Sequence, residues 1–471
     1  MAAAQKILNR KAKRPGNLVM NAKLQSIKET HELIKKGIWV YFLLLLFEGA
    51  LRKWIIPALA NPLLLARDPV AVWIIFMAYK NNLMPSNKYL TGMLVIGFVS
   101  FLTTMTLGHQ NIYVALYGVR ILVIHFPLIF IIGRVFTRND VVKMGKFILL
   151  ITFPMALLIA MQFYSPQSAW VNRGVGGSLE GAGFSGALGF FRPPATFSFT
   201  NGTTLFFGLS GPFIIYFWLN QKGINKIVLL AATLGLIMAI PLSISRALFF
   251  QVIITFLFAV IAISRKPENM SKLIIAVIGG SVVLLIMSRL TFFQKATEVF
   301  TTRLDGANES EGGLGGVLGD RYLGGMIKSI TGSSEQPFFG YGIGTGTSVG
   351  GALLSGTGER TLLIYSEDEW ARLTGEMGAI MGLGVIFVRI GLSINTAIKS
   401  YKKLSTGDLL PWVLLSFFLL TVPQGQWGQP TSLGFSIIIG GLTLASFNSM
   451  KTRKKQPGKV KVVTSDNSAE A

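Results

Sequence analysis

The sequence predicts an all-α protein that crosses a membrane many times, and three observations lead to this class. Apolar residues make up 51% of the 471 residues and charged residues only 14%, against about 25% charged in an average soluble domain. The mean hydropathy is +0.55. The apolar residues gather in stretches close to the length of about 20 that crosses a bilayer core as a helix. We therefore expect lipid to be the main solvent of this chain, which excludes an ordinary soluble enzyme.

These apolar stretches predict twelve transmembrane helices. The first two and the eleventh are short and would need flanking residues to reach across. In chain order the segments are 37–50, 70–79, 89–107, 112–132, 144–163, 199–219, 227–243, 247–264, 273–290, 375–393, 410–422 and 433–447.

The basic residues predict the orientation of these helices. The net charge is +23, and 29 of the 44 Lys and Arg lie in the two ends of the chain and in alternate loops between them. This positive-inside bias places both termini in the cytoplasm, which requires an even number of spans. In a soluble protein the same charge would favour nucleic acid. Here we expect no nucleic-acid partner, and basic ends that face anionic lipid.

The organisation that follows has five parts. Residues 1–36 form a basic cytoplasmic segment with a short surface helix over 24–34, and no cleavable signal peptide is recognised in it. Residues 37–290 hold nine transmembrane helices, and 291–374 form a large extracytoplasmic loop. Residues 375–450 hold three more helices, and 451–471 form a basic cytoplasmic tail. The loop carries 10 of the 21 acidic residues, and its apolar spacing predicts a helix over 320–331.

Several charged or polar side chains fall in or beside predicted helices. Glu48 and Arg52 have the i, i+4 spacing of an ion pair. Arg120 lies inside the fourth helix, where it is either functional or a lock between helices. Arg389 is expected to extend toward the cytoplasmic end of its helix, and His125 to be a packed, hydrogen-bonded core residue. With three His and no Cys, a multi-histidine or thiolate metal centre is not expected.

Arg246 stands out because it lies in a very short outer turn, Pro241-Leu242-Ser243-Ile244-Ser245-Arg246. A tight turn would hold its guanidinium at the outer membrane face. That planar fork suits phosphate oxygens, although a simple interfacial anchor is the alternative interpretation.

Three stretches of the sequence resemble the O-antigen ligase and polymerase superfamily of bacterial membrane glycosyltransferases. The first is the Ser-Arg turn at Ser245-Arg246. The second is Asp320-Arg321-Tyr322, a helical stretch, and then Pro337-Phe338-Phe339-Gly340-Tyr341-Gly342-Ile343-Gly344. The third is Glu367-Asp368-Glu369-Trp370-Ala371-Arg372, followed by Glu376-Met377-Gly378. A weaker likeness surrounds Arg192-Pro193-Pro194.

The resemblance implies a GT-C-like fold in a bacterial cytoplasmic membrane. It also implies a saccharide carried on a polyprenyl diphosphate and transferred outside the cytoplasm to an acceptor glycan hydroxyl. Guanidinium groups on the outer side would stabilise the departing diphosphate. We expect donor binding by the arginines and by the glycine-rich run, whose amides could approach a phosphate. The donor-binding candidates are Arg192, Arg246, Arg321, Arg372, Gly340, Gly342 and Gly344.

The acceptor hydroxyl must lose a proton, and a carboxylate could take it. Glu367 is the first candidate for this base, with Asp368 and Glu369 as alternates, whereas Glu376 is expected to be structural. Ligases of this family carry a His-Asn pair where this chain has Glu367-Asp368, which favours a polymerase or a divergent transferase. No cofactor is expected, although the acidic cluster leaves a divalent cation open as an alternative.

Two other function classes stay open at this stage. One is a secondary transporter or a flippase for lipid-linked oligosaccharides, for which Arg120 would be suited. The other is a non-catalytic scaffold among envelope polysaccharide assembly proteins. The expected partners of the main hypothesis are the lipid-linked donor, the acceptor glycan, the bilayer and such assembly proteins.

Overall fold

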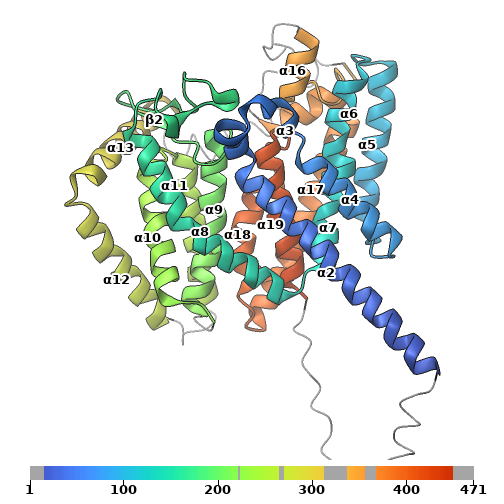
Figure 1. Cartoon of the computed structure of the whole chain (residues 1–471), viewed down its shortest axis with the longest axis horizontal. Coiled ribbons are helices and arrows are strands. Elements are labelled where there is room, and N and C mark those ends of the chain that lie inside the picture. Colours follow the sequence, from blue (N-terminus) through green and yellow to red (C-terminus); the bar gives the residue numbers. More distant parts are fainter. Residues whose placement is uncertain (1–14, 221–222, 265–269, 312–336, 356–367, 449–471) are drawn as a thin grey trace, which may run out of the picture.

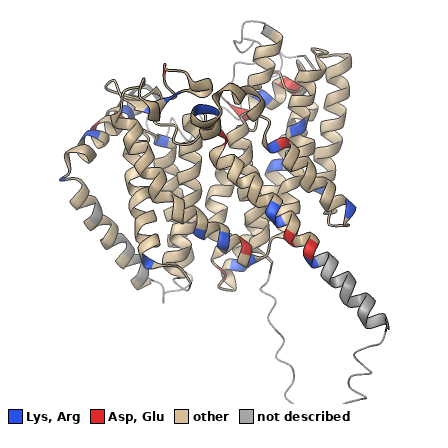
Figure 2. Ribbon diagram, viewed as in Figure 1, with Lys and Arg blue, Asp and Glu red and all other residues tan. Residues whose placement is uncertain are grey.

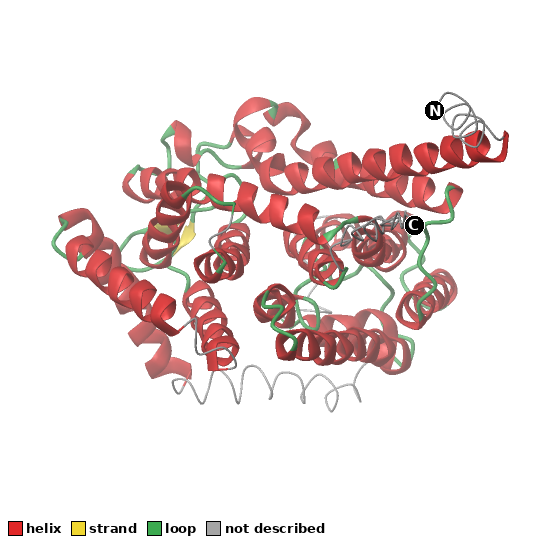
Figure 3. Ribbon diagram, turned by 90° about the horizontal axis from the view of Figure 1, so that it is seen from below, coloured by secondary structure: helices red, strands yellow, loops and turns green. Residues whose placement is uncertain are grey.

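The structure, a computed structural model, describes residues 15–220, 223–264, 270–311, 337–355 and 368–448. Within these ranges the protein is almost entirely helical (Figure 1). Two short antiparallel strands, β1 (Phe184–Ser185) and β2 (Phe191–Arg192), form a small hairpin, seen as the yellow element in Figure 3. The predicted all-α class is confirmed for the described residues.

The helices follow one another with short connections. The first half of the chain contains α2 (Pro15–Ala50), η1 (Leu51–Ile55), η2 (Pro57–Leu59), α3 (Ala60–Leu63), α4 (Arg67–Lys80), α5 (Lys88–Thr106), α6 (Ile112–Arg120), η3 (Ile121–His125), α7 (Phe126–Val135), α8 (Arg138–Tyr164), η4 (Trp170–Asn172) and η5 (Val175–Gly177). The second half contains α9 (Thr200–Leu219), α10 (Lys226–Leu242), α11 (Arg246–Ser264), α12 (Met270–Met287), α13 (Thr291–Glu311), α16 (Ser348–Ser355), α17 (Glu369–Ser405), α18 (Leu410–Thr421) and α19 (Pro430–Ser446).

Each of the twelve predicted apolar segments lies in helical chain and runs past its end by at most about three residues, whereas α2, α8 and α17 extend well beyond the predicted 37–50, 144–163 and 375–393. By length and composition, seven helical stretches of the described residues could cross a membrane, and four further apolar helices are shorter. Long stretches of these helices carry no charged residue (Figure 2). The seven long stretches are Pro57–Lys80, Lys88–Thr106, Ile112–Val135, Arg138–Tyr164, Thr200–Leu219, Arg246–Ser264 and Glu369–Ser405.

The core of the bundle is formed by α9, α18 and α19. The most apolar window of α9 is 83% buried, whereas that of α11 is 28% buried, so α9 is central and α11 peripheral. α19 packs most extensively on α7, where Gly440 and Gly441 face Ile129 and Ile132. Small residues allow this close approach, a common way for apolar helices to associate without a gain from water exclusion.

At one end of the bundle, polar contacts hold together elements that are far apart in the chain. Lys35 of α2 pairs with Asp140 at the start of α8 at 3.0 Å, and the neighbouring Arg138 pairs with Asp408. Asn448, just after α19, donates hydrogen bonds to the carbonyl oxygen of Phe136, 2.7 Å, and to that of Gly133. The start of α8 and the end of α19 therefore lie at the same end, with α16 and α3 at the other (Figure 1).

One of the two predicted local helices lies within the described residues, and the structure extends it. The expected short helix over 24–34 is part of α2, which runs without interruption from Pro15 to Ala50. The predicted helix over 320–331 lies outside the described residues. The long loop does contain helix, because α13 occupies its start and α16 lies near its end.

α17 consists of two helices that fold back on each other at Gly378. Gly378 has φ 73° and ψ 176°, which is not helical. Glu369 and Arg389 would lie about 30 Å apart on a continuous helix, yet Arg389 Nη1 is 2.8 Å from Glu369 Oε1. A Cβ on Gly382 would meet the Leu373 carbonyl oxygen at 2.7 Å. The segment 369–377 is therefore a short helix antiparallel to the longer part that follows Gly378.

The turn η1 carries a buried lysine beside the segment that leads to α9. Lys53 is fully buried, and its Nζ donates a hydrogen bond to the Ala195 carbonyl oxygen at 2.6 Å. Ala195 has φ +52°, an uncommon conformation for a residue other than glycine. Its amide donates to Gln162 Oε1. These contacts fix the corner between Arg192 and α9.

Burial lowers the pKa of Lys53 to about 7, from 10.5 in the unfolded chain. Between these values the unfolded chain binds a proton that the folded protein does not, so stability rises with pH from about 7 to about 10.5. We expect the thermal unfolding midpoint in detergent to increase by a few degrees from about pH 6 to about pH 9. Lys53→Met should flatten this dependence, whereas Lys295→Met, at a half-buried site, should not. A flat profile for the unmodified protein would contradict the assignment.

Gly378→Ala should destabilise the protein, because an added Cβ would lie 2.0 Å from the Phe338 carbonyl oxygen. The positive φ adds strain of about 1–3 kcal/mol. The matched control is Gly279→Ala in α12, where a Cβ would meet nothing within 4 Å and alanine is the better helix former. We expect a lower unfolding midpoint for Gly378→Ala alone. Equal midpoints for the two variants would show that the hairpin tolerates a side chain at this position.

Candidate functional site

A cavity of about 1100 Å³ opens at the end of the bundle where α3 and α16 lie. Its lining comes from both halves of the chain, beginning with Glu48 of α2 and ending with Thr431 of α19. Four of the predicted site residues line it: Arg192, Asp368, Glu369 and Arg372. Arg192 and Asp368 are separated by more than a third of the sequence, so the fold, and not local spacing, brings them to one cavity.

Arg192 lies on β2 and gives its part of the cavity a positive character. Burial, together with the nearby positive charges of Arg303 and Arg246, lowers its pKa to about 10. Arg192 is therefore still charged at neutral pH, and its buried Nε has no hydrogen-bond partner among the described residues. An anion placed here would relieve the repulsion between these guanidinium groups.

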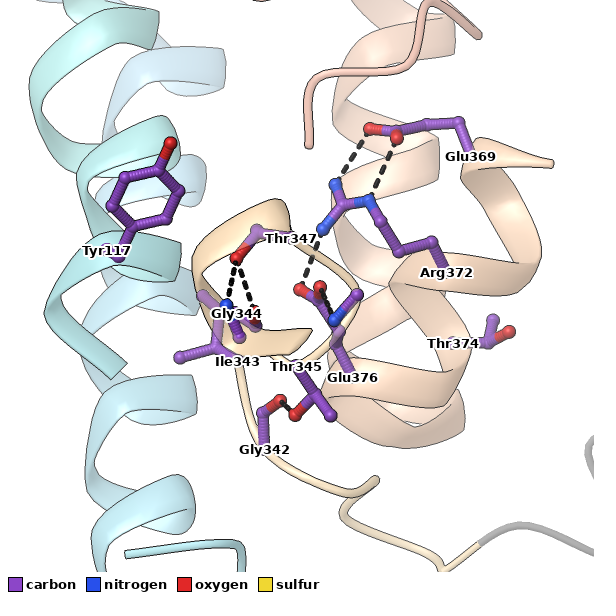
Figure 4. A network of polar contacts seen from close by, with 12 residues as sticks. Tyr117, Gly342, Ile343, Gly344, Thr345, Thr347, Glu369, Arg372, Thr374 and Glu376 are labelled. Carbon is purple, nitrogen blue, oxygen red and sulfur yellow. Dashed lines mark hydrogen bonds and ion pairs between the residues drawn. The ribbon is translucent and has the colours of Figure 1, made fainter. Parts of the chain in front are cut away.

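The segment 369–377 brings a cluster of buried charges to the same cavity. Arg372 donates from Nε and Nη2 to the two oxygens of Glu369, each at 2.9 Å, and its Nη1 lies 2.7 Å from Glu376 Oε2. Arg389 adds a 2.8 Å bond to Glu369 and bonds to the carbonyl oxygens of Val422 and Gly425. Figure 4 shows Arg372 between Glu369 and Glu376. Two carboxylates and two guanidiniums thus neutralise one another.

This cluster decides two predictions about single residues. Glu376 accepts a hydrogen bond from the Gly346 amide at 2.9 Å, which confirms its structural assignment. The expectation that Arg389 extends toward the cytoplasmic end is wrong, because Arg389 is fully buried and its guanidinium stacks over Trp427. It finds a carboxylate partner because the chain reverses at Gly378.

Of the acidic candidates, Asp368 and Glu369 have different surroundings. Glu369 is 5% exposed, and a proton on it would break charge-assisted bonds to two arginines. Asp368 precedes the first turn of α17, is exposed and lines the cavity. Asp368 is therefore the described carboxylate best placed to accept a proton from a molecule in the cavity. Glu367 lies outside the described residues.

The predicted Glu48–Arg52 pair is confirmed, with Nη1 and Oε1 3.4 Å apart. Arg52 also donates to Ser198 Oγ at 2.9 Å, which ties the end of α2 to the segment before α9. A second arginine that the spacing did not indicate, Arg67, lies 3.3 Å from Glu48 and donates to the Pro430 carbonyl oxygen. Glu48 therefore faces the cavity as a paired carboxylate.

Four described helices begin at the cavity. Phe199, Ser348, Asp368 and Gln429 line it and lie at or just before the first residues of α9, α16, α17 and α19. The side chains that precede α9, α17 and α19 make no capping bond to the helix amides. Amide dipoles sum to a partial positive charge at each helix start, so their convergence adds to the positive field of Arg192.

The predicted glycines lie beside the cavity and not on its wall. Gly340 and Gly342 donate their amides to the carbonyl oxygens of Pro337 and Glu376. A Cβ on Gly344 would lie 2.2 Å from the Val114 carbonyl oxygen. The backbone of this glycine-rich run therefore packs against α6 and the first segment of α17. Gly346, which follows the three predicted glycines, does line the cavity.

The remaining arginine candidates lie apart from the lining. Arg246 begins α11 after the predicted tight turn, in which Ile244 has φ +48°, and its positive charge helps to lower the pKa of Arg192. Arg321 lies outside the described residues. Arg303 of α13, which no motif indicated, donates to the carbonyl oxygens of Ser185 and Gly186 at 3.2 Å. Only contact through the folded chain reveals that Arg303 belongs with Arg192.

A second polar network lies deeper, below Tyr117 of the cavity wall. Arg120 binds Asp68 at 2.6 Å and stacks on Tyr117. His125, 1% exposed, contacts Asp68 at 3.0 Å and the Tyr41 hydroxyl at 2.9 Å. The prediction of a hydrogen-bonded core histidine is confirmed. Arg120 joins α4 to α6 as an ion pair.

Among the described residues no group of three or more His, Cys, Asp or Glu side chains is arranged to hold a metal ion. No histidine is found among the cavity-lining side chains of the described chain. Comparison of this chain with protein-family models, with curated proteins and with solved structures finds no match.

Proposed function

We propose that this protein transfers or polymerises glycan chains outside the cytoplasm, taking them from a polyprenyl-diphosphate-linked donor and joining them to an acceptor sugar hydroxyl. One observation carries the proposal: a single large cavity is lined by Arg192, by Asp368 and by the starts of four helices. Such a site offers positive charge for a diphosphate and a carboxylate for a hydroxyl proton. Its volume of about 1100 Å³ lies just above the usual range for ligand pockets.

The positive part of the cavity would hold the diphosphate. Arg192 is charged, partly buried and repelled by Arg246 and Arg303. A bound diphosphate would offset this repulsion by its attraction to the guanidinium groups. Fixed guanidiniums and helix starts also stabilise the charge that grows on the leaving group during transfer. Arg321, in the neighbouring loop sequence, stays a candidate for the same role.

The reaction at this site would be a displacement at the anomeric carbon. The acceptor oxygen forms a bond to that carbon while the bond to the diphosphate oxygen breaks, and the polyprenyl diphosphate leaves with the electron pair. The hydroxyl proton moves to Asp368, and Glu367 is the alternative acceptor. A direct displacement inverts the anomeric configuration, so we propose an inverting glycosyltransferase.

The distribution of basic residues in the sequence and the apolar helices support one membrane arrangement. We propose that the twelve apolar helices span a bacterial cytoplasmic membrane as a GT-C-like bundle with both termini inside. The end fastened by Lys35–Asp140 and Arg138–Asp408 would then be cytoplasmic, and the cavity would face outward. An O-antigen or exopolysaccharide polymerase or ligase would act at that face.

The second candidate is a secondary transporter or a flippase for lipid-linked saccharides. It is favoured by the buried network of Arg120, Asp68, His125 and Tyr41, since charged groups inside a membrane often mark transport paths. The two candidates differ in their products. A transferase makes a longer glycan in detergent without a sealed membrane, whereas a transporter needs two compartments.

Asp368→Asn should lower the rate of glycan transfer by about a hundredfold or more, because general-base catalysis contributes about 10²–10⁴. The asparagine keeps the size of the side chain, so binding of geranylgeranyl diphosphate should change little. The measurement is product formation by purified protein given a polyprenyl-diphosphate oligosaccharide, with Glu180→Gln, outside the cavity lining, as the control. Full activity in Asp368→Asn would remove this residue from the role of base and leave Glu367.

Arg192→Gln should act on binding and stability in opposite directions. Removal of one of three mutually repelling positive charges should leave the unfolding midpoint equal or higher. Affinity for geranylgeranyl diphosphate should fall about tenfold or more with the loss of a charge-assisted contact. Arg173→Gln provides a matched control on the same side of the bundle. Undiminished affinity in Arg192→Gln would contradict the diphosphate assignment.

A further inference from the structure

Two amide side chains lie on the wall of the same cavity as Arg192 and the charged cluster of α17. Asn201 belongs to the first turn of α9, and Gln429 directly precedes α19. Asn201 Nδ2 donates hydrogen bonds to Gln429 Oε1 and to Ser432 Oγ. Both residues line the cavity. This contact joins the starts of two central helices and fixes the two amides relative to each other.

The pair leaves one acceptor and one donor group without partners. An amide offers a carbonyl oxygen and two N–H donors. Within the described part of the chain, neither Asn201 Oδ1 nor Gln429 Nε2 has a hydrogen-bond partner. If the Asn201–Gln429 pair served only to link α9 to α19, its unpaired donor and acceptor would have no need to face a cavity. The wall therefore presents a donor and an acceptor, neither of which carries charge.

Aromatic rings line the cavity close to Asn201. Phe199, two residues before it, is 45% exposed, and Phe184 of β1 is 49% exposed. Their ring centroids are 5.5 Å apart in an edge-on arrangement. Exposed rings of this size inside a cavity offer apolar faces to a ligand. A sugar ring has matching properties, because one face carries C–H groups and its edge carries hydroxyl or acetamido groups.

We infer that Asn201 and Gln429 recognise an uncharged sugar ring of the substrate, at a position where that ring packs on Phe199. The ring must carry an acceptor beside a donor, either two neighbouring hydroxyls or an acetamido group beside a hydroxyl. This inference deepens the proposed function and rests on it for the identity of the substrate. It divides the cavity into a cationic part near Arg192 for the diphosphate and a neutral part for the saccharide.

The test uses the full-length protein in nanodiscs and two trisaccharide probes, chitotriose and cellotriose, with binding followed by saturation-transfer NMR and titration calorimetry. Gln429→Met keeps the length of the side chain but removes the amide. We expect the affinity for at least one trisaccharide to fall about tenfold or more, because a site built to donate hydrogen bonds loses them. Binding of geranylgeranyl diphosphate should stay within about twofold, a change worth less than RT.

Two further variants keep the result interpretable. Gln429→Glu preserves size and polarity but replaces the donor by an acceptor, so it should also weaken trisaccharide binding even if Gln429→Met unfolds. Gln294→Met makes the same change at an amide outside this cavity and should have no effect. A preference for chitotriose supports recognition of the acetamido group, and equal binding supports recognition of neighbouring hydroxyls.

Several outcomes would overturn the inference. Binding of neither trisaccharide at about 10 mM, or equal affinity in the unmodified protein and both Gln429 variants, would remove the saccharide site. The proposed function fails separately. Gln429-dependent trisaccharide binding in a protein that transfers no glycan supports the sugar site and counts against the transferase. Transfer activity in a protein whose affinity for saccharides does not depend on Gln429 supports the transferase and counts against the sugar site.

Discussion

The position of Glu369 between two buried guanidiniums is the interaction on which the shape of the cavity depends. A carboxylate away from water is costly unless it is paired and hydrogen-bonded, and removal of one partner of a buried pair typically costs about 3–5 kcal/mol. Glu369 satisfies this requirement through Arg372, from its own short helix, and Arg389, from the antiparallel helix behind it. The pairing therefore closes the hairpin at Gly378 and fixes where Asp368 enters the cavity.

Helix starts that meet at one place explain how a bundle rich in apolar residues creates a polar site. Here α9, α17 and α19 begin at the cavity, so amides that have no partner inside their own helix face a common space. The cavity wall can then bind an anionic group and a neutral group of one ligand, because Arg192 contributes positive charge whereas Asn201 and Gln429 are uncharged.

Local spacing predicted the contacts that are local in the chain. The apolar stretches gave the helices, the i, i+4 spacing gave Glu48–Arg52, and the short turn before Arg246 was recognised from its length. The contacts that define the cavity were not predictable in this way. Arg389 meets Glu369 only because Gly378 breaks a helix, and a Glu-x-Gly sequence is equally compatible with an unbroken one. Arg67, Arg303 and Gln429 joined the site through packing between distant segments, for which a single sequence contains no signal.

The positions of the lining residues along the chain also determine when the cavity is completed during synthesis. Glu48 belongs to the first described helix and Gln429 to the turn before the last, so these two parts of the cavity wall leave the ribosome about 380 residues apart. A nascent chain that ends after α18 still lacks the Asn201–Gln429 contact and the carbonyl oxygen of Pro430 that accepts a hydrogen bond from Arg67. The cavity wall is thus completed only after the start of α19 has been made, and a chain that stops before Gln429 would have an incomplete pocket.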